Sequence, residues 1–185
     1  GNNQLGPLSY KIIEPHKHWA LELDQNSSGI KFSLEYKSRP VPYMVKKVVY
    51  PPKGEQPTGF SHFFQPGRFS GSILIDNSRF EGDFLGSRDR SWGVRAAVER
   101  MWIHFWIQVQ FSSFCISLYY SEDRNHSVTY LDGAVFPDDD PPVPIVDLRH
   151  KMTFDSGARE QTGAELMGVD SKGQAFKLHS RQLSR

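Results

Sequence analysis

The sequence predicts an all-β protein, an antiparallel β-barrel, half-barrel or sandwich with little helix. Three observations lead to this prediction: several segments alternate apolar and polar residues, turn-forming residues separate these segments, and only residues 94–100 could form a short helix. Alternation matters because successive side chains of a strand point to opposite faces. Many short strands separated by turns are typical of barrels and sandwiches, whereas a doubly wound nucleotide fold would alternate strands with helices.

The N-terminal part shows the alternation in four segments, at residues 19–23, 30–36, 69–75 and 80–84. The turn sequence Asp76-Asn77-Ser78 separates the last two, which predicts a hairpin. Residues 37–59 contain five prolines and two glycines with little alternation, which predicts a long connection. We therefore place a boundary there, with residues 1–59 belonging to or linking from a first half and residues 60–185 forming a barrel domain.

The strongest predicted strand covers residues 101–111. One of its faces is entirely apolar and the other carries Trp102, His104 and Trp106. Residues 114–120 resume the alternation after Ser112-Ser113, so the two segments form a hairpin. Further strands are predicted at residues 127–136, 145–154, 163–169 and 174–180. Turns are predicted at 131–133 and 170–173, and a proline- and aspartate-rich loop at 137–144.

Composition and the absence of known motifs argue against several classes of function. The formal net charge is +1, so no strong field attracts nucleic acid, and no apolar run is long enough to span a membrane. The single cysteine, Cys115, forms no internal disulfide, and the N-terminus has no signal-peptide pattern; both fit the cytoplasm. No phosphate loop or dinucleotide motif is present, so no cofactor is expected. Of the seven histidines only His16 and His18 are close together, and zinc needs a third ligand, so no metal is expected.

One segment, residues 86–93, stands out. It reads Gly-Ser-Arg-Asp-Arg-Ser-Trp-Gly and places Arg88, Asp89, Arg90 and Trp92 between two glycines. In one interpretation these side chains lie in the barrel, where they contact a ligand or donate a proton, because arginine binds carboxylates and a buried aspartate can act as an acid. In the other interpretation the charges form an internal salt-bridge plug and the tryptophan fills the core.

A second candidate is the polar-leaning face of residues 101–111. Trp102 and Trp106 would line a cavity for an apolar ligand, and His104 would fix a polar end or act as an acid or base. Tyr119 would place a hydroxyl at the mouth of that cavity. The alternative is that these aromatic residues pack ordinarily and His104 is structural.

The segment His62 to Ser72 and the motif at residues 86–93 resemble a group of bacterial lipocalin-like proteins, the AttH and hydroxyneurosporene synthase (carotenoid 1,2-hydratase) group. The opening, from Leu5 to Trp19, is also similar. The resemblance implies two linked lipocalin-like halves and relatives longer than this chain. The motif of that group reads Arg-Asp-His-Ser-Trp-Gly, so its tryptophan falls on Trp92 and its histidine on Arg90. Arginine is not a general acid near neutral pH, which argues against hydratase chemistry.

Three functions remain open at this point. The first is a binding module that holds a hydrophobic small molecule of the isoprenoid, steroid or fatty-acyl type. The second is a hydratase, isomerase or cyclase in which Asp89, Arg90 and His104 are catalytic and Arg88, Trp92, Trp102, Trp106 and Tyr119 bind the substrate. The third is a structural half-barrel of a larger protein. A homodimer is expected if a sheet edge is left open.

Overall fold

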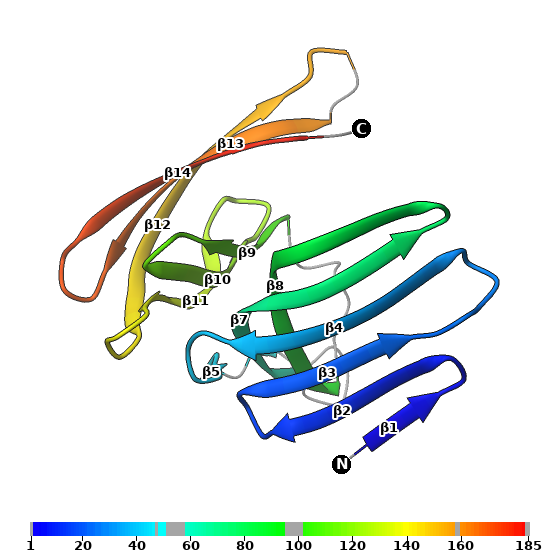
Figure 1. Ribbon diagram of the computed structural model, residues 1–185. Coiled ribbons are helices and arrows are strands. Elements are labelled where there is room, and N and C mark those ends of the chain that lie inside the picture. The colour runs from blue at the N-terminus through cyan, green and yellow to red at the C-terminus, as the bar shows by residue number, and fades with distance from the viewer. Residues whose placement is uncertain (1, 47, 51–57, 95–101, 158–159, 184–185) are drawn as a thin grey trace. The chain divides into compact units, whose positions relative to one another are not determined.

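The computed structural model describes residues 2–46, 48–50, 58–94, 102–157 and 160–183 (Figure 1). Within these ranges the regular structure is antiparallel β-strand, so the predicted all-β fold class is confirmed. The described residues contain no helix that could cross a lipid bilayer. Of residues 94–100, the segment that could form a short helix, residues 95–100 lie outside the described residues, and Val94 is the last residue of a strand.

The chain divides into two compact units. Unit 1 comprises Gly1–Val94 with Gln110–Ser112, and unit 2 comprises Arg95–Val109 with Ser113–Arg185. Residues 60–94, which the sequence analysis grouped with the C-terminal part, lie in unit 1. Each unit is built on one curled antiparallel sheet.

The sheet of unit 1 has eight described strands: β1 (Asn2–Leu5), β2 (Leu8–Glu14), β3 (His18–Leu23), β4 (Ile30–Ser38), β5 (Tyr43–Met44), β6 (Val48–Tyr50), β7 (Thr58–Ile75) and β8 (Ser78–Val94). Strands β1 to β4 follow one another in the sheet, and β4 pairs with the second half of β7. The first half of β7 pairs with β5 and β6, while β8 pairs with β7 along its whole length. Strand β7 is thus the strand with which β4, β5, β6 and β8 all pair (Figure 1).

The predicted hairpin is confirmed, and its turn lies at Asp76-Asn77, where Asp76 has a positive φ of 51°. Two features differ from prediction. Both strands are more than twice as long as their alternating segments, and the connection at residues 37–59 contains β5 and β6. The reason is the same in both cases: the long β7 offers free backbone groups on each side, and pairing with them stabilises segments whose own pattern is weak.

The core of unit 1 is aromatic. Trp19 and Tyr36, opposite each other on β3 and β4, are almost fully buried, and their ring centroids lie 5.4 Å apart. Tyr36 also packs against Phe69 at 4.9 Å, and its hydroxyl donates to the backbone carbonyl of Gln65. Burial of each large ring is worth roughly 2–3 kcal/mol, so this cluster fixes the register of β3, β4 and β7.

The sheet of unit 2 has six described strands in sequence order: β9 (Ile103–Gln110), β10 (Phe114–Glu122), β11 (Val128–Pro137), β12 (Val143–Phe154), β13 (Gln161–Asp170) and β14 (Ala175–Arg181). Strand β12 pairs with β11 only at Val143 and Pro144 and then runs along β13. The two halves therefore separate beyond that point and enclose a core of Ile116, Leu118, Tyr120, Leu148 and Leu166, with the predicted apolar face of β9 against it.

The turn predicted at residues 131–133 is wrong, because these residues lie inside β11. Gly133 is opposite Leu118, and a Cβ atom there would lie 2.3 Å from the Ser117 carbonyl oxygen. Glycine is required for close approach of the two backbones rather than for a turn. The turn predicted at 170–173 is confirmed: Asp170 Oδ1 accepts from the amides of Lys172 and Gln174, and Gly173 has a φ of 80°.

Candidate functional site

The motif at residues 86–93 is part of strand β8, and this decides where its side chains point. Arg88 and Arg90 lie opposite Gln65 and Phe63, and Trp92 lies opposite Ser61, all on one face of the β7–β8 hairpin. Asp89, opposite Phe64, lies on the other face. A strand separates neighbouring residues, so the three charges do not form one cluster.

An open groove lies on the face that carries the arginines. Its volume is about 610 Å³, and its lining residues are His16, Pro42, Met44, Phe63, Arg90 and Trp92. We call it the Trp92 groove. Trp92 is 48% exposed and Met44 52% exposed, whereas Phe63 is buried. The Phe63 and Trp92 rings meet edge to face at 6.4 Å, so the groove has an aromatic wall with a cation beside it.

Gln65 holds the groove in shape. It is fully buried, and its Nε2 donates to the carbonyl oxygens of His16, at 2.6 Å, and Pro40, at 3.0 Å. These bonds tie the β2–β3 turn and the proline-rich connection to β7. His16 has a positive φ of 61°, which such a turn requires of one residue. The sequence gives no sign of this role, because a glutamine in an aromatic segment has no local partner.

Arg88 lies behind the groove wall. Its Cζ is 4.6 Å from the centre of the Trp19 ring and 4.8 Å from that of Phe63, so the guanidinium is held between two rings. Its Nη1 is buried and has no hydrogen-bond partner in the described part of the chain. The Cζ of Arg90 is 6.0 Å from the centre of the Trp92 ring. Among the described residues neither arginine forms an ion pair.

Asp89 has a different environment. Its Oδ2 lies 3.4 Å from Nε2 of His62, which is 2% exposed. Asp89 does not line the Trp92 groove, and it points away from Arg90. The hypothesis that Asp89 protonates a substrate while Arg90 stabilises its charge requires both side chains on one face, and strand β8 separates them.

The second candidate surface lies in unit 2, on β9 and β10. Trp102 is 56% exposed and Trp106 is 50% exposed, and Arg124 lies over the Trp102 ring. Tyr119 stacks on His104 at 5.4 Å and on Trp106 at 5.8 Å. Burial lowers the pKa of His104 below its ordinary value of 6.5, with a partly opposing hydrogen bond at the Tyr120 backbone. The residues form an aromatic surface in which His104 is neutral at neutral pH.

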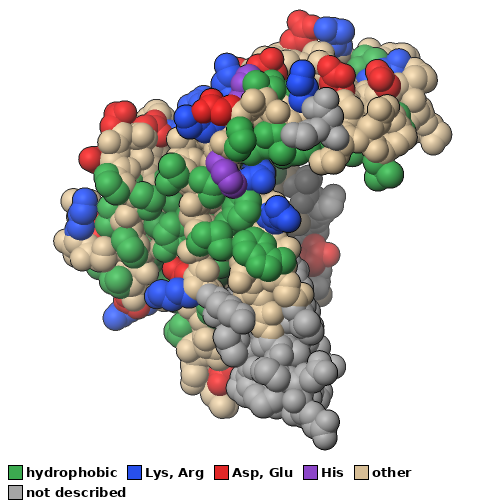
Figure 2. Space-filling view, turned by 90° about the horizontal axis from the view of Figure 1, so that it is seen from below, with side chains coloured by type: hydrophobic (Ala, Val, Ile, Leu, Met, Phe, Trp, Pro, Cys, Tyr) green, Lys and Arg blue, Asp and Glu red, His purple; other side chains and the backbone are tan. Residues whose placement is uncertain are grey.

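His104 Nδ1 also lies 2.9 Å from Ser121 Oγ, so the ring is fixed by a hydroxyl as well as by stacking. A neutral histidine held in this way has the character of a packed structural residue more than of a proton donor. Figure 2 shows hydrophobic side chains next to one another in the view, with lysine and arginine side chains beside them.

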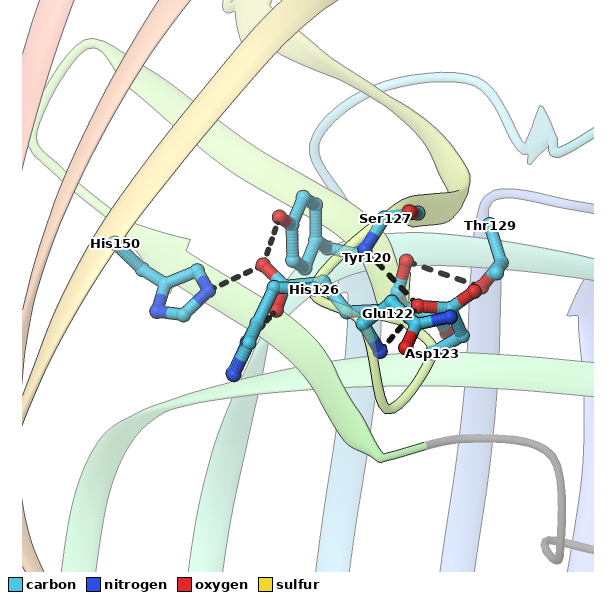
Figure 3. A network of polar contacts seen from close by, with 9 residues as sticks. Tyr120, Glu122, Asp123, His126, Ser127, Thr129 and His150 are labelled. Atoms are coloured by element: carbon cyan, nitrogen blue, oxygen red, sulfur yellow. Dashed lines mark hydrogen bonds and ion pairs between the residues drawn. The ribbon is translucent and has the colours of Figure 1, made fainter.

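A buried polar network in unit 2 was not predicted from the sequence (Figure 3). Glu122, at the end of β10, is 4% exposed. Its Oε1 accepts hydrogen bonds from the Tyr120 hydroxyl and from His150 Nε2, the latter at 2.6 Å, and its Oε2 accepts from His126 Nδ1 at 3.0 Å. The contacts join β10, the β10–β11 turn and β12.

The network sets the charge of its members. Burial raises the pKa of Glu122, but the hydrogen bonds from Tyr120, His150 and His126 outweigh burial and leave the pKa below its ordinary value. Burial and the adjacent Glu122 carboxylate raise the pKa of Tyr120. Glu122 is therefore ionised at neutral pH, and both of its carboxylate oxygens accept hydrogen bonds. Its role is to connect strands β10 and β12 rather than to donate a proton. The sequence contains a signal for the burial of Glu122, because this residue occupies the next position in the apolar alternation of residues 114–120.

The described residues contain no group of three or more His, Cys, Asp or Glu side chains arranged to hold a metal ion. His18 Nε2 lies 3.0 Å from Glu35 Oε2, and the neighbouring His16 lines the Trp92 groove. These two histidines thus have separate surroundings.

Fold and groove together define an all-β protein of the half-barrel class, with an aromatic groove on one sheet. The chain belongs to a family described as a domain of unknown function (DUF7064), which matches it over residues 1–185. No curated protein and no solved structure matches the chain significantly.

Proposed function

We propose that the protein binds a hydrophobic small molecule in the Trp92 groove. The single observation that carries the proposal is the groove itself: a hollow of about 610 Å³ whose wall combines buried Phe63 with half-exposed Trp92 and Met44. Small-molecule sites are typically concave, mostly apolar and equipped with a few polar groups, which is the character of this groove. The resemblance to lipocalin-like proteins supports the same function.

Two features argue for binding without catalysis. Asp89, the acid of the alternative hypothesis, lies on the opposite face of β8 from the groove. His16 is the histidine of the groove, and it has no carboxylate partner to orient it among the described contacts. Catalysis by proton transfer generally needs a positioned acid or base, so the observations favour a binding module.

The test is calorimetric titration of the purified protein with oleate, farnesol and progesterone, supported by native mass spectrometry. Wild-type protein should bind at least one of the three, and Trp92→Ala should weaken that binding about tenfold or more, because the ligand loses an aromatic surface worth roughly 1.5–3 kcal/mol. Phe80→Ala is the matched control, since Phe80 is an aromatic residue of the same strand with a similar exposure of 50% but does not line the groove.

Affinity should be unchanged in Phe80→Ala. If instead Trp106→Ala abolishes binding while Trp92→Ala retains it, the ligand occupies the aromatic surface of unit 2 and the proposal is wrong. Absence of binding for all three compounds to the wild-type protein would also contradict it. Circular dichroism and urea unfolding of each variant verify that the fold is retained.

A further inference from the structure

The groove side of strand β8 carries two arginines. Arg88 and Arg90 both lie on this face of β8, and the acidic residue between them, Asp89, lies on the other face beside His62. None of the described residues that line the Trp92 groove is acidic. Among the described contacts, those of the two guanidinium groups are to the aromatic rings of Trp19, Phe63 and Trp92.

This arrangement leaves Arg88 only partly compensated. The stabilisation of a cation by an aromatic ring is smaller than the cost of removing a charged group from water without a counter-ion. Arg88 is partly buried, and its Nη1 donor has no acceptor among the residues that the structure describes. Within the same residues, Trp19 Nε1 beside it also lacks an acceptor. A bound anion would supply the negative charge that the described residues of this face do not.

Arg90 is the residue placed to meet such an anion. It lines the groove and is exposed, whereas Arg88 is held behind Phe63 between two rings. A guanidinium presents two parallel N–H donors that match the two oxygens of a carboxylate. The apolar wall formed by Phe63, Trp92 and Met44 suits the hydrocarbon part of the same molecule.

We propose that the ligand of the Trp92 groove is a hydrophobic carboxylate, with its carboxylate paired to Arg90 and its hydrocarbon chain against Trp92 and Phe63. This inference rests on the proposed function, and it adds the chemical class of the ligand. Arg88 contributes at longer range: it adds positive potential behind Phe63 and keeps that ring in place as the wall of the groove.

The experiment compares decanoate with decanol, which have the same chain and differ in charge. Calorimetry at neutral pH and low salt should show decanoate binding to wild-type protein about tenfold or more tightly than decanol, since a charge-assisted hydrogen bond contributes roughly 1.5–3 kcal/mol. Arg90→Gln should abolish this preference. Arg79→Gln is the matched control, because Arg79 is an exposed arginine of the same strand that pairs with Glu81 and lies outside the groove. It should retain the preference.

The outcomes separate this inference from the function on which it rests. Equal affinity of wild-type protein for decanoate and decanol overturns the carboxylate assignment but leaves a hydrophobic groove. No binding of either compound contradicts the groove as well. A preference that survives in Arg90→Gln removes Arg90 as its source, and tighter binding of decyl sulfate than of decanoate shows a site for another anion. Raised salt should weaken decanoate binding and leave decanol binding unaffected.

Discussion

Glu122 shows at the scale of one residue how a charge can be kept inside a β-sheet protein. A buried carboxylate is costly unless its oxygens are paired. Here Tyr120 and His150 donate to one oxygen and His126 donates to the other. Because the donors come from two strands and a turn, the carboxylate also fixes the distance between them.

We expect Glu122→Gln to destabilise the protein by about 2–4 kcal/mol, because the amide is a poorer acceptor and brings an N–H group toward the histidine donors. Urea unfolding followed by circular dichroism measures the loss. Glu165→Gln is the control in the same unit: Glu165 pairs with Lys177 on the surface, and solvent screens that pair. An equal loss in both variants would show that the network of Glu122 has no special role.

Strand β8 shows, at the scale of one element, how the alternation of a strand places neighbouring charged residues in different surroundings. A stretch that reads Arg-Asp-Arg suggests one ionic cluster, yet a strand sends its central residue to the opposite face. Asp89 therefore lies beside His62, while Arg88 and Arg90 lie among aromatic rings. The groove owes its positive charge to this separation.

The β7–β8 hairpin also allows a test of why glycines occur within strands. Gly71 and Gly82 lie opposite each other with nearly equal positive φ angles, 137° and 143°. A Cβ atom at Gly71 would lie 2.1 Å from the Ser33 carbonyl oxygen, whereas one at Gly82 would meet nothing within 4 Å. Both substitutions to alanine strain the backbone, but only the first adds a collision with β4.

We expect Gly82→Ala to cost roughly 1–2 kcal/mol through the backbone angle alone and Gly71→Ala clearly more, about 3 kcal/mol or above. The difference between the two unfolding free energies measures the close approach of β4 and β7. Similar losses would mean that the strands move apart easily at this point.

At the scale of the whole molecule, stability should decrease with acidification in two steps. His104 has a lowered pKa, so the unfolded chain binds its proton first and the folded state loses stability as pH falls below 6.5. Glu122 also has a lowered pKa, so its contribution is complete above 4.5 and is lost as pH falls through the lower folded value. Both effects have the same sign.

Unfolding free energies measured from about pH 7.5 to about pH 3 test this dependence. His104→Gln should reduce the loss in the first step, and Glu122→Gln should reduce the loss in the second. Constant wild-type stability down to about pH 5 would contradict the first step, and parallel curves for wild type and Glu122→Gln would contradict the second.

The fold class could be predicted because alternation is a local property. The apolar faces of residues 30–36 and 101–111 are visible in the sequence itself, and the structure has strands β4 (Ile30–Ser38) and β9 (Ile103–Gln110) there. The lengths of β7 and β8 and the presence of β5 and β6 could not be predicted, since they depend on pairing with a distant partner. The turn predicted at residues 131–133 failed because a glycine that permits close backbone approach looks in sequence like a glycine that permits a turn.

For the candidate site the sequence alone singled out the motif at residues 86–93 and, within it, Arg88, Arg90 and Trp92 as candidate site residues. Only the tertiary structure decided that Phe63, Met44 and His16 join two of them around a groove, that Gln65 supports it, and that Glu122 collects three donors. The physical reason is the separation along the sequence of the residues that interact. Side-chain direction follows from neighbours along the chain, whereas a groove or a buried charge is made by residues that are distant in sequence and meet only when the sheet folds.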